Sequence, residues 1–568
     1  EIFNEGDYLR AVQDKIAAET VSKVLYPADS FAAGRELRLI QEYFLVACAL
    51  RDIIRRYRHR HVSFDAFPEK TAIQMNDTHP ALAVAELMRQ LVDEYELPWE
   101  RAWEITVATL GYTNHTLLSE ALEKWPVALL EKVLPRHLQI IYEINRRLLA
   151  EIERRWPGDP DRMGRMSLIE EDPEKKVRMA YLAVVGSHAV NGVSALHSEL
   201  IKNELVPDFH ALWPERFGNQ TNGITPRRWL LKANPRLAEL ITATIGDTWV
   251  VDLPELRRLE DFAEDRSFLT ALGDVKKRNK EDLQKVIRAT TGVSVSPESL
   301  FAVQAKRIHE YKRQLLKVLY IVYEYLLLVE DGWVPPIPRT HIFAGKAAPG
   351  YWQAKQIIKL IHCLGEVING DPRAAEFIKV VFIPDYRVSL AERIIPAADL
   401  SEQLSTAGTE ASGTGNMKFA LNGALTIGTL DGANIEIRDE VGAENIYIFG
   451  LTIEEVRRFR RTGGYDPGEW YRHHPPIRRV MDALRDGRFS PRERDLSRWV
   501  WDRIIAGGDF YFHLPDLLSY QEAQERVGRD YGDEVLWTRR AAVNIARMGR
   551  FSSDRTIAGY ARDIWGIR

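Results

Sequence analysis

The sequence predicts an α/β protein, and three of its features support that class. Apolar residues at helical spacing dominate residues 1–220. Beyond about residue 220, short β-rich runs alternate with longer helical segments. The sequence contains no short internal repeat and no low-complexity tract. Alternation of this kind is typical of βαβ units, which form a mostly parallel sheet with helices on both faces.

Helices are expected at three places in the first part of the chain. Residues 37–49 carry apolar side chains at near-helical spacing, with polar residues between them. Residues 77–91 form a second candidate helix, in which Pro80 suits the first turn. Residues 177–205 are expected to form one long, partly buried helical region.

The strands of the second part are expected at five β-rich runs: residues 300–304, 341–344, 378–383, 424–427 and 446–449. The first three runs are each followed by a helical segment, which ends near residue 328, 368 or 395. Ligands of parallel sheets bind beyond the carboxyl ends of the strands. We therefore look for functional residues directly after these runs.

The composition excludes several classes of protein. Hydrophobic residues make up 45% and charged residues 28%, as in ordinary globular proteins, and the formal net charge of −4 lacks the basic footprint of a nucleic-acid binder. The longest apolar stretches are far shorter than a membrane span. The two cysteines, Cys48 and Cys363, lie far apart among apolar neighbours, which argues against a disulfide framework and favours the cytoplasm. The chain opens at Glu1 without a secretory signal, and we expect an amino-terminal part to be absent.

The most informative motif is EASGTGNMK at residues 410–418. A glycine loop that runs into a helix, expected here at residues 416–422, offers backbone N–H groups to an anion, and Lys418 lies three residues beyond the last loop glycine. Phe419 stands where a Walker A loop needs Ser or Thr for magnesium. A lysine beside a phosphate-binding loop fits pyridoxal phosphate, which forms a Schiff base with lysine. The alternative interpretation is a tight turn with a solvated lysine.

A second group of cations follows the run 300–304. Lys306, Arg307, Lys312 and Arg313 suggest another anion site, with a solvated basic helix face as the alternative. Tyr386 and Arg387 follow the run 378–383, which aims one more cation at the same edge of the sheet.

Other polar motifs have plain structural interpretations. In TNGITPRRW at residues 221–229, Thr225 suits a helix N-cap and Pro226 the first helical position. Residues 76–80 and 112–116 are polar islands, whose histidines are more often structural than catalytic. No metal site is expected, because the His-Glu pair at residues 309–310 lacks the second histidine of a zinc motif.

Together these stretches resemble the glycogen, starch and maltodextrin phosphorylase family over essentially the whole chain. The most specific motifs are GTEASGTGNMK at residues 408–418 and KRIHEYK at residues 306–312. The resemblance implies two Rossmann-like domains that face a cleft, the glycosyltransferase B arrangement. Residues 1–220 would form the latter part of an apparently truncated amino-terminal domain, and residues 221–568 the carboxyl-terminal domain that binds pyridoxal phosphate.

The resemblance also implies a cofactor and its contacts. Pyridoxal 5′-phosphate would form a Schiff base with Lys418, and its 5′-phosphate would serve as a proton relay. The other residues that match cofactor contacts are Lys306, Gly413, Thr414, Gly415, Tyr386, Arg387 and Trp229. Those that match catalytic roles are Lys418, Lys306, His115, and the two binders of substrate phosphate, Arg307 and Lys312. Those that match glucosyl contacts or line and gate the cleft are His115, Asn222, Glu410, Ser412, Gly413, Asp29 and Asp77.

The implied reaction is the reversible phosphorolysis of α-1,4-glucan ends by inorganic phosphate, with retention, to α-glucose 1-phosphate. The implied enzyme is a cytoplasmic homodimer that binds neither nucleic acid nor membrane, and it needs no carboxylate pair of the glycosidase kind. Two alternatives stay open: a nucleotide-sugar glucosyltransferase of the same fold, and a non-catalytic glucan-binding chain. The sequence does not separate glycogen from starch or maltodextrin.

Overall fold

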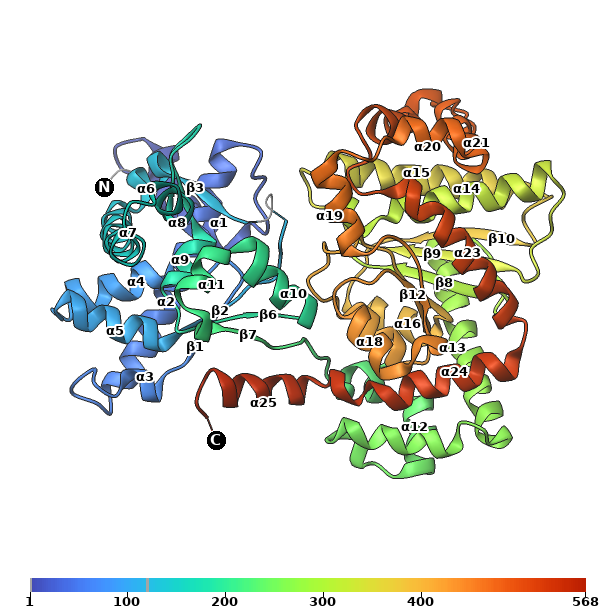
Figure 1. Cartoon of the computed structure of the whole chain (residues 1–568), viewed down its shortest axis with the longest axis horizontal. Coiled ribbons are helices and arrows are strands. Elements are labelled where there is room, and N and C mark those ends of the chain that lie inside the picture. Colours follow the sequence, from blue (N-terminus) through green and yellow to red (C-terminus); the bar gives the residue numbers. More distant parts are fainter. Residues whose placement is uncertain (1–2, 119–121, 568) are drawn as a thin grey trace. The chain divides into compact units, whose positions relative to one another are not determined.

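The computed structural model describes residues 3–118 and 122–567, and it divides into two compact units. The first unit comprises the chain up to Val193, Ser198–Asn219, and the residues from Tyr560 onward. The second unit comprises Ser194–His197 and Gln220–Gly559. Each unit contains its own parallel sheet with helices around it (Figure 1). The roles expected for residues 1–220 and 221–568 remain predictions.

The second unit contains a six-stranded sheet in which every paired neighbour is parallel. Its strand order is β10-β9-β8-β11-β12-β13. The chain therefore adds β9 and β10 on one side of β8 and then β11, β12 and β13 on the other side. The bounds are β8 Leu300–Ala305, β9 Arg339–Ala344, β10 Ile378–Ile383, β11 Leu400–Gln403, β12 Leu425–Gly428 and β13 Tyr447–Ile448. All five expected strands are present to within two residues at each end. The expectation missed β11, because three of its four residues are polar.

Alternate residues of the central strands serve two separate cores. Leu300 and Ala302 pack with α14 and α15, whereas Phe301 and Val303 pack with α13 and α16. This period of two is the geometry of a strand buried on both faces. Figure 1 shows α14 and α15 on one side of the sheet and α13 and α16 on the other. The bounds of these helices are α13 Arg266–Thr291, α14 Gln314–Glu330, α15 Trp352–Gly370 and α16 Val388–Ala397.

The remaining helices of the second unit surround this sheet. The helix α17 opens at the loop that carries the glycine motif, and α25 passes at Tyr560 into the residues of the first unit. Their bounds are α12 Pro235–Ile245, α17 Gly415–Leu421, α18 Asn434–Val441, α19 Ile453–Thr462, α20 Pro467–His473, α21 Pro475–Arg485, α22 Arg498–Trp501, α23 His513–Tyr531, α24 Glu534–Ala546 and α25 Ser553–Asp563.

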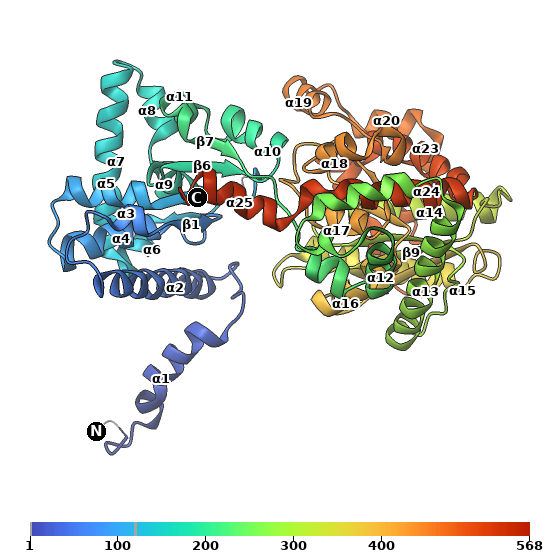
Figure 2. The ribbon, with the colours of Figure 1, turned by 90° about the horizontal axis from the view of Figure 1, so that it is seen from below.

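The first unit contains a parallel sheet of order β1-β2-β6-β7 and an antiparallel sheet of order β3-β5-β4. The parallel strands are β1 Ile73–Asn76, β2 Leu110–Thr113, β6 Ala189–Gly192 and β7 Phe217–Asn219, and the antiparallel ones are β3 Lys124–Pro126, β4 Ile169–Glu170 and β5 Lys176–Arg178. The helices are α1 Tyr8–Lys23, α2 Ala32–Arg58, α3 Phe67–Lys70, α4 Ala83–Arg89, α5 Trp99–Thr109, α6 Val127–Val133, α7 Pro135–Arg155, α8 Pro160–Met166, α9 Met179–Val185, α10 Ala195–Leu200 and α11 Pro207–Leu212. Figure 2 shows α1 projecting from α2, and α1 has no buried residue.

Two helix expectations for the first unit were wrong. Residues 177–205 do not form one helical region, because β6 lies between α9 and α10 and pairs with β2 and β7. β6 is buried at three of its four residues, so it lacks the alternation that marks a half-exposed strand. The candidate helix 77–91 begins only at Ala83, since Asp77 adopts a left-handed backbone with φ 64°. The expected helix 37–49 lies within α2.

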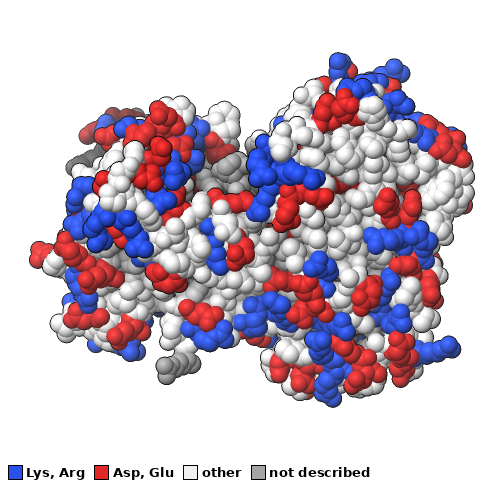
Figure 3. All heavy atoms as spheres, viewed as in Figure 1, with Lys and Arg blue, Asp and Glu red and all other residues white. Residues whose placement is uncertain are grey.

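Every helix in the described part of the chain is too short or too polar to cross a lipid bilayer. On the face shown in Figure 3, cationic and anionic side chains are interspersed over each unit.

Candidate functional site

The residues of chemical interest in the second unit follow the strands β8 and β11. These two strands are parallel neighbours at the point where the strand order reverses. Lys306 directly follows β8 and Gln403 ends β11, and the Lys306 Nζ donates to Gln403 Oε1 at 2.6 Å. A reversal of strand order opens a crevice at the carboxyl edge of a parallel sheet. This contact therefore places Lys306 at the standard ligand position of the fold.

Burial and the nearby Lys312 lower the pKa of Lys306 to about 8, while Glu410 and Asp431 act in the opposite direction. Lys306 is thus a cation in a poorly solvated place at neutral pH. A cation in such a place attracts an anion more strongly than a solvated lysine does.

The segment after Lys306 is a tight turn and not a solvated helix face. Residues Glu310–Lys312 form a single 3₁₀ turn, and Arg313 closes it with φ 52°. Lys312 Nζ lies 2.6 Å from Glu410 Oε2, and the Tyr311 hydroxyl donates to the other oxygen of Glu410 at 3.2 Å. Arg307 is exposed at the start of this turn.

Arg313 does not belong to the expected group of four cations at an anion site. Its side chain is fully buried and pairs with Asp516 of α23 at 2.7 Å. Its guanidinium also donates to the carbonyl oxygens of Leu404 at 2.5 Å and Ser405 at 3.2 Å. Arg313 therefore fixes the chain that leaves β11, and a ligand cannot reach it.

The glycine loop leads from β11 into α17. Ser412 is buried, and Gly413 has φ 76°, a conformation that favours glycine. A Cβ on Gly415 would meet no atom within 4 Å, so the loop borders open space there. The expected helix 416–422 appears as α17, one residue earlier at each end.

Lys418 lies on α17 with its Nζ 4.0 Å from the centre of the Trp229 ring. Desolvation by burial lowers the pKa of Lys418. A lysine in such surroundings is deprotonated more readily and is a better nucleophile. Trp229 is held in turn, because its carbonyl oxygen accepts from Asn422 Nδ2 at 2.8 Å.

The expectation of an N-cap at Thr225 was wrong. Residues Arg227–Lys232 form a π-helical turn whose N-cap is Pro226, without a side-chain capping bond. Trp229 donates its N–H to the Thr225 carbonyl at 3.0 Å. Asn222 is half-buried, and its carbonyl oxygen accepts from Arg555 at 3.4 Å.

Tyr386 and Arg387 follow β10, two strands from β8, at the same edge of the sheet. Burial raises the pKa of Tyr386 to about 12, so its hydroxyl stays protonated. Arg387 is exposed and donates to Asp385 Oδ2 at 2.8 Å. This arrangement adds an aromatic ring and a cation to the carboxyl edge.

The other three predicted site residues belong to the first unit. Asp77 and His115 follow the neighbouring parallel strands β1 and β2. His115 Nε2 lies 3.3 Å from Asn76 Oδ1, and burial lowers the pKa of His115. Asp29 is exposed in the loop before α2, where its carbonyl oxygen accepts from Arg35.

A model of the carbohydrate phosphorylase family matches residues 1–567 of the chain. The chain belongs to the carbohydrate phosphorylase family. It is 54% identical over 566 residues to a glycogen phosphorylase of Synechocystis sp., covering 100% of this chain and 66% of the relative. It is 52% identical to the muscle form of Bos taurus, covering 100% and 68%, and 51% identical to the brain form of Ovis aries, covering 99% and 68%. The chain thus spans about two thirds of the length of these relatives.

Pyridoxal phosphate, bound through a lysine, is the characteristic cofactor of the carbohydrate phosphorylase family. The described residues fit this group. Lys418 offers an amine of lowered pKa beside an aromatic ring, and Lys306 offers a half-buried cation at the same edge of the sheet. The open space at Gly415 leaves room beside the loop.

One polar cluster of the first unit is not predicted by any motif of the sequence. Glu42, His79 and Glu123 bring ligand-type atoms within 4.8 Å of one another. Arg38 lies 2.8 Å from Glu42 and 3.5 Å from Glu123, so a guanidinium already supplies the positive charge there. The three residues come from positions far apart in the chain, and we assign no metal to them.

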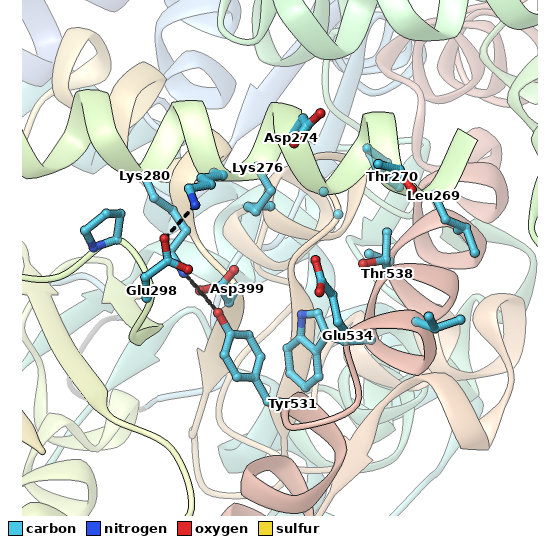
Figure 4. A pocket seen from close by; sticks show the side chains of 18 of the residues that line it. Leu269, Thr270, Asp274, Lys276, Lys280, Glu298, Asp399, Tyr531, Glu534 and Thr538 are labelled. Atoms are coloured by element: carbon cyan, nitrogen blue, oxygen red, sulfur yellow. Dashed lines mark hydrogen bonds and ion pairs between the residues drawn. The ribbon is translucent and has the colours of Figure 1, made fainter. Parts of the chain in front are cut away.

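A cavity of about 870 Å³ in the second unit is lined mainly by α13 and α24 (Figure 4), and none of the predicted site residues lines it. Lys280 donates to Asp399, to Tyr531 and to the carbonyl of Ser299, and Lys276 donates to three backbone carbonyls. Both ammonium groups therefore have their full set of acceptors. We interpret this cavity as a structural gap in the phosphorylase fold and not as the reaction site.

Proposed function

We propose that the protein is an α-1,4-glucan phosphorylase, a hexosyltransferase that releases glucosyl units from non-reducing ends as α-glucose 1-phosphate, with retention. Similarity to glycogen phosphorylases along the whole chain supports this activity. The observation that carries the proposal is the contact of Lys306 with Gln403 at the strand-order reversal, at the end of the strand that leads to the glycine loop. A site with clustered cations at that edge suits a reaction whose substrates include phosphate.

In this proposal, Lys418 holds pyridoxal phosphate covalently. When bound, the cofactor supplies a 5′-phosphate that exchanges a proton with the substrate phosphate. Lys306 and the loop residues Gly413, Thr414 and Gly415 hold that 5′-phosphate. The ring is held by Trp229, Tyr386 and Arg387. The short distance from Lys418 to Trp229 and the buried Tyr386 hydroxyl support these assignments.

Arg307 and Lys312 bind the substrate phosphate beside that of the cofactor. Two phosphates in contact repel each other, and each raises the proton affinity of the other. Lys306, Arg307 and Lys312 offset this repulsion, so that a proton can reside on the phosphate nearest the glycosidic oxygen. The pair between Lys312 and Glu410 holds the ammonium in place until phosphate binds.

The glucosyl unit is held by Asn222, Glu410, Ser412 and Gly413 of the second unit and by His115 of the first, with Asp77 and Asp29 lining and gating the cleft. This assignment includes two Rossmann-like domains that face each other. The parallel sheet in each unit supports it. His115 would hold the sugar in the transition state through a hydrogen bond.

The proposal further includes a cytoplasmic homodimer that acts on glucan and inorganic phosphate. The free thiols of Cys48 and Cys363 fit a reducing compartment. The helix α1 exposes Tyr8, Leu9 and Ile16, which suits a contact between two copies of the chain. Sedimentation of the intact protein tests this part, and a monomer at micromolar concentration contradicts it.

The direct test is the phosphate-dependent release of glucose 1-phosphate from glucan by the intact protein, with Lys418→Ala as the inactive variant. Lys355→Ala is the matched control, because Lys355 is an exposed lysine of α15. Transfer from a nucleotide sugar without cofactor would instead indicate a glucosyltransferase. Glucan binding without release of glucose 1-phosphate would indicate a binding protein.

A further inference from the structure

Asp431 lies behind the candidate site and accepts hydrogen bonds from four donors. Its Oδ1 accepts from the backbone N–H groups of Gly408 at 2.9 Å and Gly432 at 3.0 Å. Its Oδ2 accepts from the Ser405 hydroxyl at 2.7 Å and from the Glu410 N–H at 2.9 Å. Only 1% of Asp431 is exposed. One buried carboxylate therefore fixes three positions of the segment between β11 and the glycine loop.

These four donors are neutral, and the described residues include no ion-pair partner for Asp431. Burial raises the pKa of Asp431 to about 6, although the hydroxyl and amide donors lower it. The carboxylate is thus charged at neutral pH in a place that disfavours charge. A buried carboxylate of this kind is retained where its acceptor geometry matters more than a gain in stability.

The residues next to Asp431 support the same segment. A Cβ on Gly432 would lie 2.7 Å from the Ser412 carbonyl oxygen and 2.9 Å from that of Glu410. Ala433 donates its N–H to the Ser412 carbonyl at 2.9 Å. The turn that carries Asp431 therefore packs directly against residues 410–412.

Glu410 links this support to the cations. Its backbone N–H is held by Asp431, and its carboxylate accepts from Lys312 at 2.6 Å and from the Tyr311 hydroxyl at 3.2 Å. A shift of the Glu410 backbone would move both partners. The chain of contacts thus runs from Asp431 through Glu410 to Lys312.

We propose that Asp431 is a positioning residue of the phosphorolysis reaction, which holds Gly408 and Glu410 in the conformation that sets Lys312 for the substrate phosphate. The inference rests on the proposed function. Asp431 acts through Glu410, and the substitution of its carboxylate affects phosphate binding more than it affects the turnover of bound substrate.

The test compares three variants of the intact, cofactor-loaded protein. Asp431→Asn replaces an acceptor oxygen by a donor that faces amide N–H groups, and Ser405→Ala removes only one of the four donors. Asp399→Asn is the matched control, because Asp399 is a buried carboxylate (2% exposed) at the start of β11 that accepts from the Phe301 N–H and from Lys280, whereas the glycine loop follows the other end of that strand. All three variants are compared with the parent by their unfolding free energies and by kcat and KM for phosphate.

We expect Asp431→Asn to raise the KM for phosphate about tenfold while kcat falls less than about threefold, as for a loss of substrate binding. Ser405→Ala should raise the KM about two- to fourfold, and it keeps the inference testable if Asp431→Asn does not fold. Asp399→Asn should lose stability without a change in KM. An unchanged KM in Asp431→Asn, or in Ser405→Ala where the former does not fold, overturns the inference. A change in KM that matches that of Asp399→Asn also overturns it.

Amide hydrogen exchange separates this inference from the proposed function. In Asp431→Asn, the amides of Gly408 and Glu410 should exchange at least tenfold faster than in the parent, and in Asp399→Asn they should not. This measurement needs no activity. A parent that releases no glucose 1-phosphate would contradict the proposed function, whereas unchanged exchange at Gly408 and Glu410 would contradict the role of Asp431.

Discussion

The ammonium of Lys312 lies 2.6 Å from a carboxylate oxygen of Glu410, although 98 positions separate the two residues in the chain. The pair forms because Lys312 follows β8 and Glu410 follows β11, and these strands are parallel neighbours. In the proposed assignment Lys312 binds the substrate phosphate and Glu410 binds the glucosyl unit, so the pair would join these two contacts.

Lys312→Ala should lower kcat/KM for phosphate at least 100-fold, because it removes a charge from the proposed phosphate site and leaves the Glu410 carboxylate unpaired. A double-mutant cycle with Glu410→Gln should give a coupling energy of about 0.5–3 kcal/mol, as for side chains in direct contact. Steady-state kinetics of the two single variants and the double variant measure it. Additive effects would show that the pair has no role in phosphate binding.

Lys418→Arg should abolish covalent attachment of pyridoxal phosphate while keeping a positive charge, because a guanidinium is not a nucleophilic amine. Borohydride reduction of the parent followed by peptide mass analysis should find the added mass on Lys418. Lys355→Arg should retain full incorporation. Added mass on another lysine would contradict the assignment of Lys418.

The affinity of the cofactor-free protein for inorganic phosphate should fall about tenfold between pH 7 and pH 9, because Lys306 loses its proton above its lowered pKa of about 8. Inorganic phosphate itself gains negative charge over the lower part of this range, and this change acts on the parent and on its variants alike. Lys306→Arg should show no such decline, because a guanidinium stays charged at both pH values, and titration calorimetry can show this. An equal decline in that variant would assign the pH dependence to another group.

The same shift has a consequence for stability. The folded pKa of Lys306 lies below the unfolded value of 10.5, so the unfolded chain binds more protons between pH 8 and 10.5. The contribution of Lys306 to stability should therefore become less unfavourable as pH rises through this range. Lys306→Met should lack this contribution.

Asp516→Ala should lower the free energy of unfolding by about 3–5 kcal/mol, because it leaves the fully buried guanidinium of Arg313 without its counter-ion. The matched control is Glu493→Ala, which removes an exposed partner of Lys359 and should cost less than about 1 kcal/mol. Denaturant unfolding measures both. A cost for Asp516→Ala no greater than that of the control would show that Arg313 is satisfied by backbone carbonyls alone.

Glu42→Gln should change the free energy of unfolding at pH 7 by less than about 1 kcal/mol, since burial and Glu123 raise the pKa of Glu42 to about 9 and keep it protonated. The raised pKa makes the parent lose stability as pH rises from 4.5 to 9, and this loss should be smaller in Glu42→Gln. Glu123→Gln should cost about 1.5–3 kcal/mol, because it removes a charged acceptor for His79 and Thr78. Unfolding curves at pH 5, 7 and 9 compare them, and a large cost for Glu42→Gln at pH 7 would show that Glu42 is ionised.

Sequence patterns were reliable where the chain is strongly apolar. The runs that became β8, β9 and β10 combine buried strands with longer helices, and both periods are visible in the residues themselves. The patterns failed for β11 and β6, whose few residues are buried by neighbouring strands and include polar side chains. The sequence pattern also failed to predict that Arg313 is buried, because an arginine next to Lys312 in the sequence looks like another surface cation.

The sequence by itself determined the α/β class, the glycine loop before Lys418 and the membership of the carbohydrate phosphorylase family. These features are recognised from the spacing of residues along the chain and from the residues of the motifs. Only the tertiary structure decided that Lys306 reaches Gln403, that Arg313 is buried against Asp516, and that Asp431 supports Glu410. Each of these relationships joins residues from separate strands or loops. Their proximity arises from the order of strands in the sheet, which spacing along the chain does not encode.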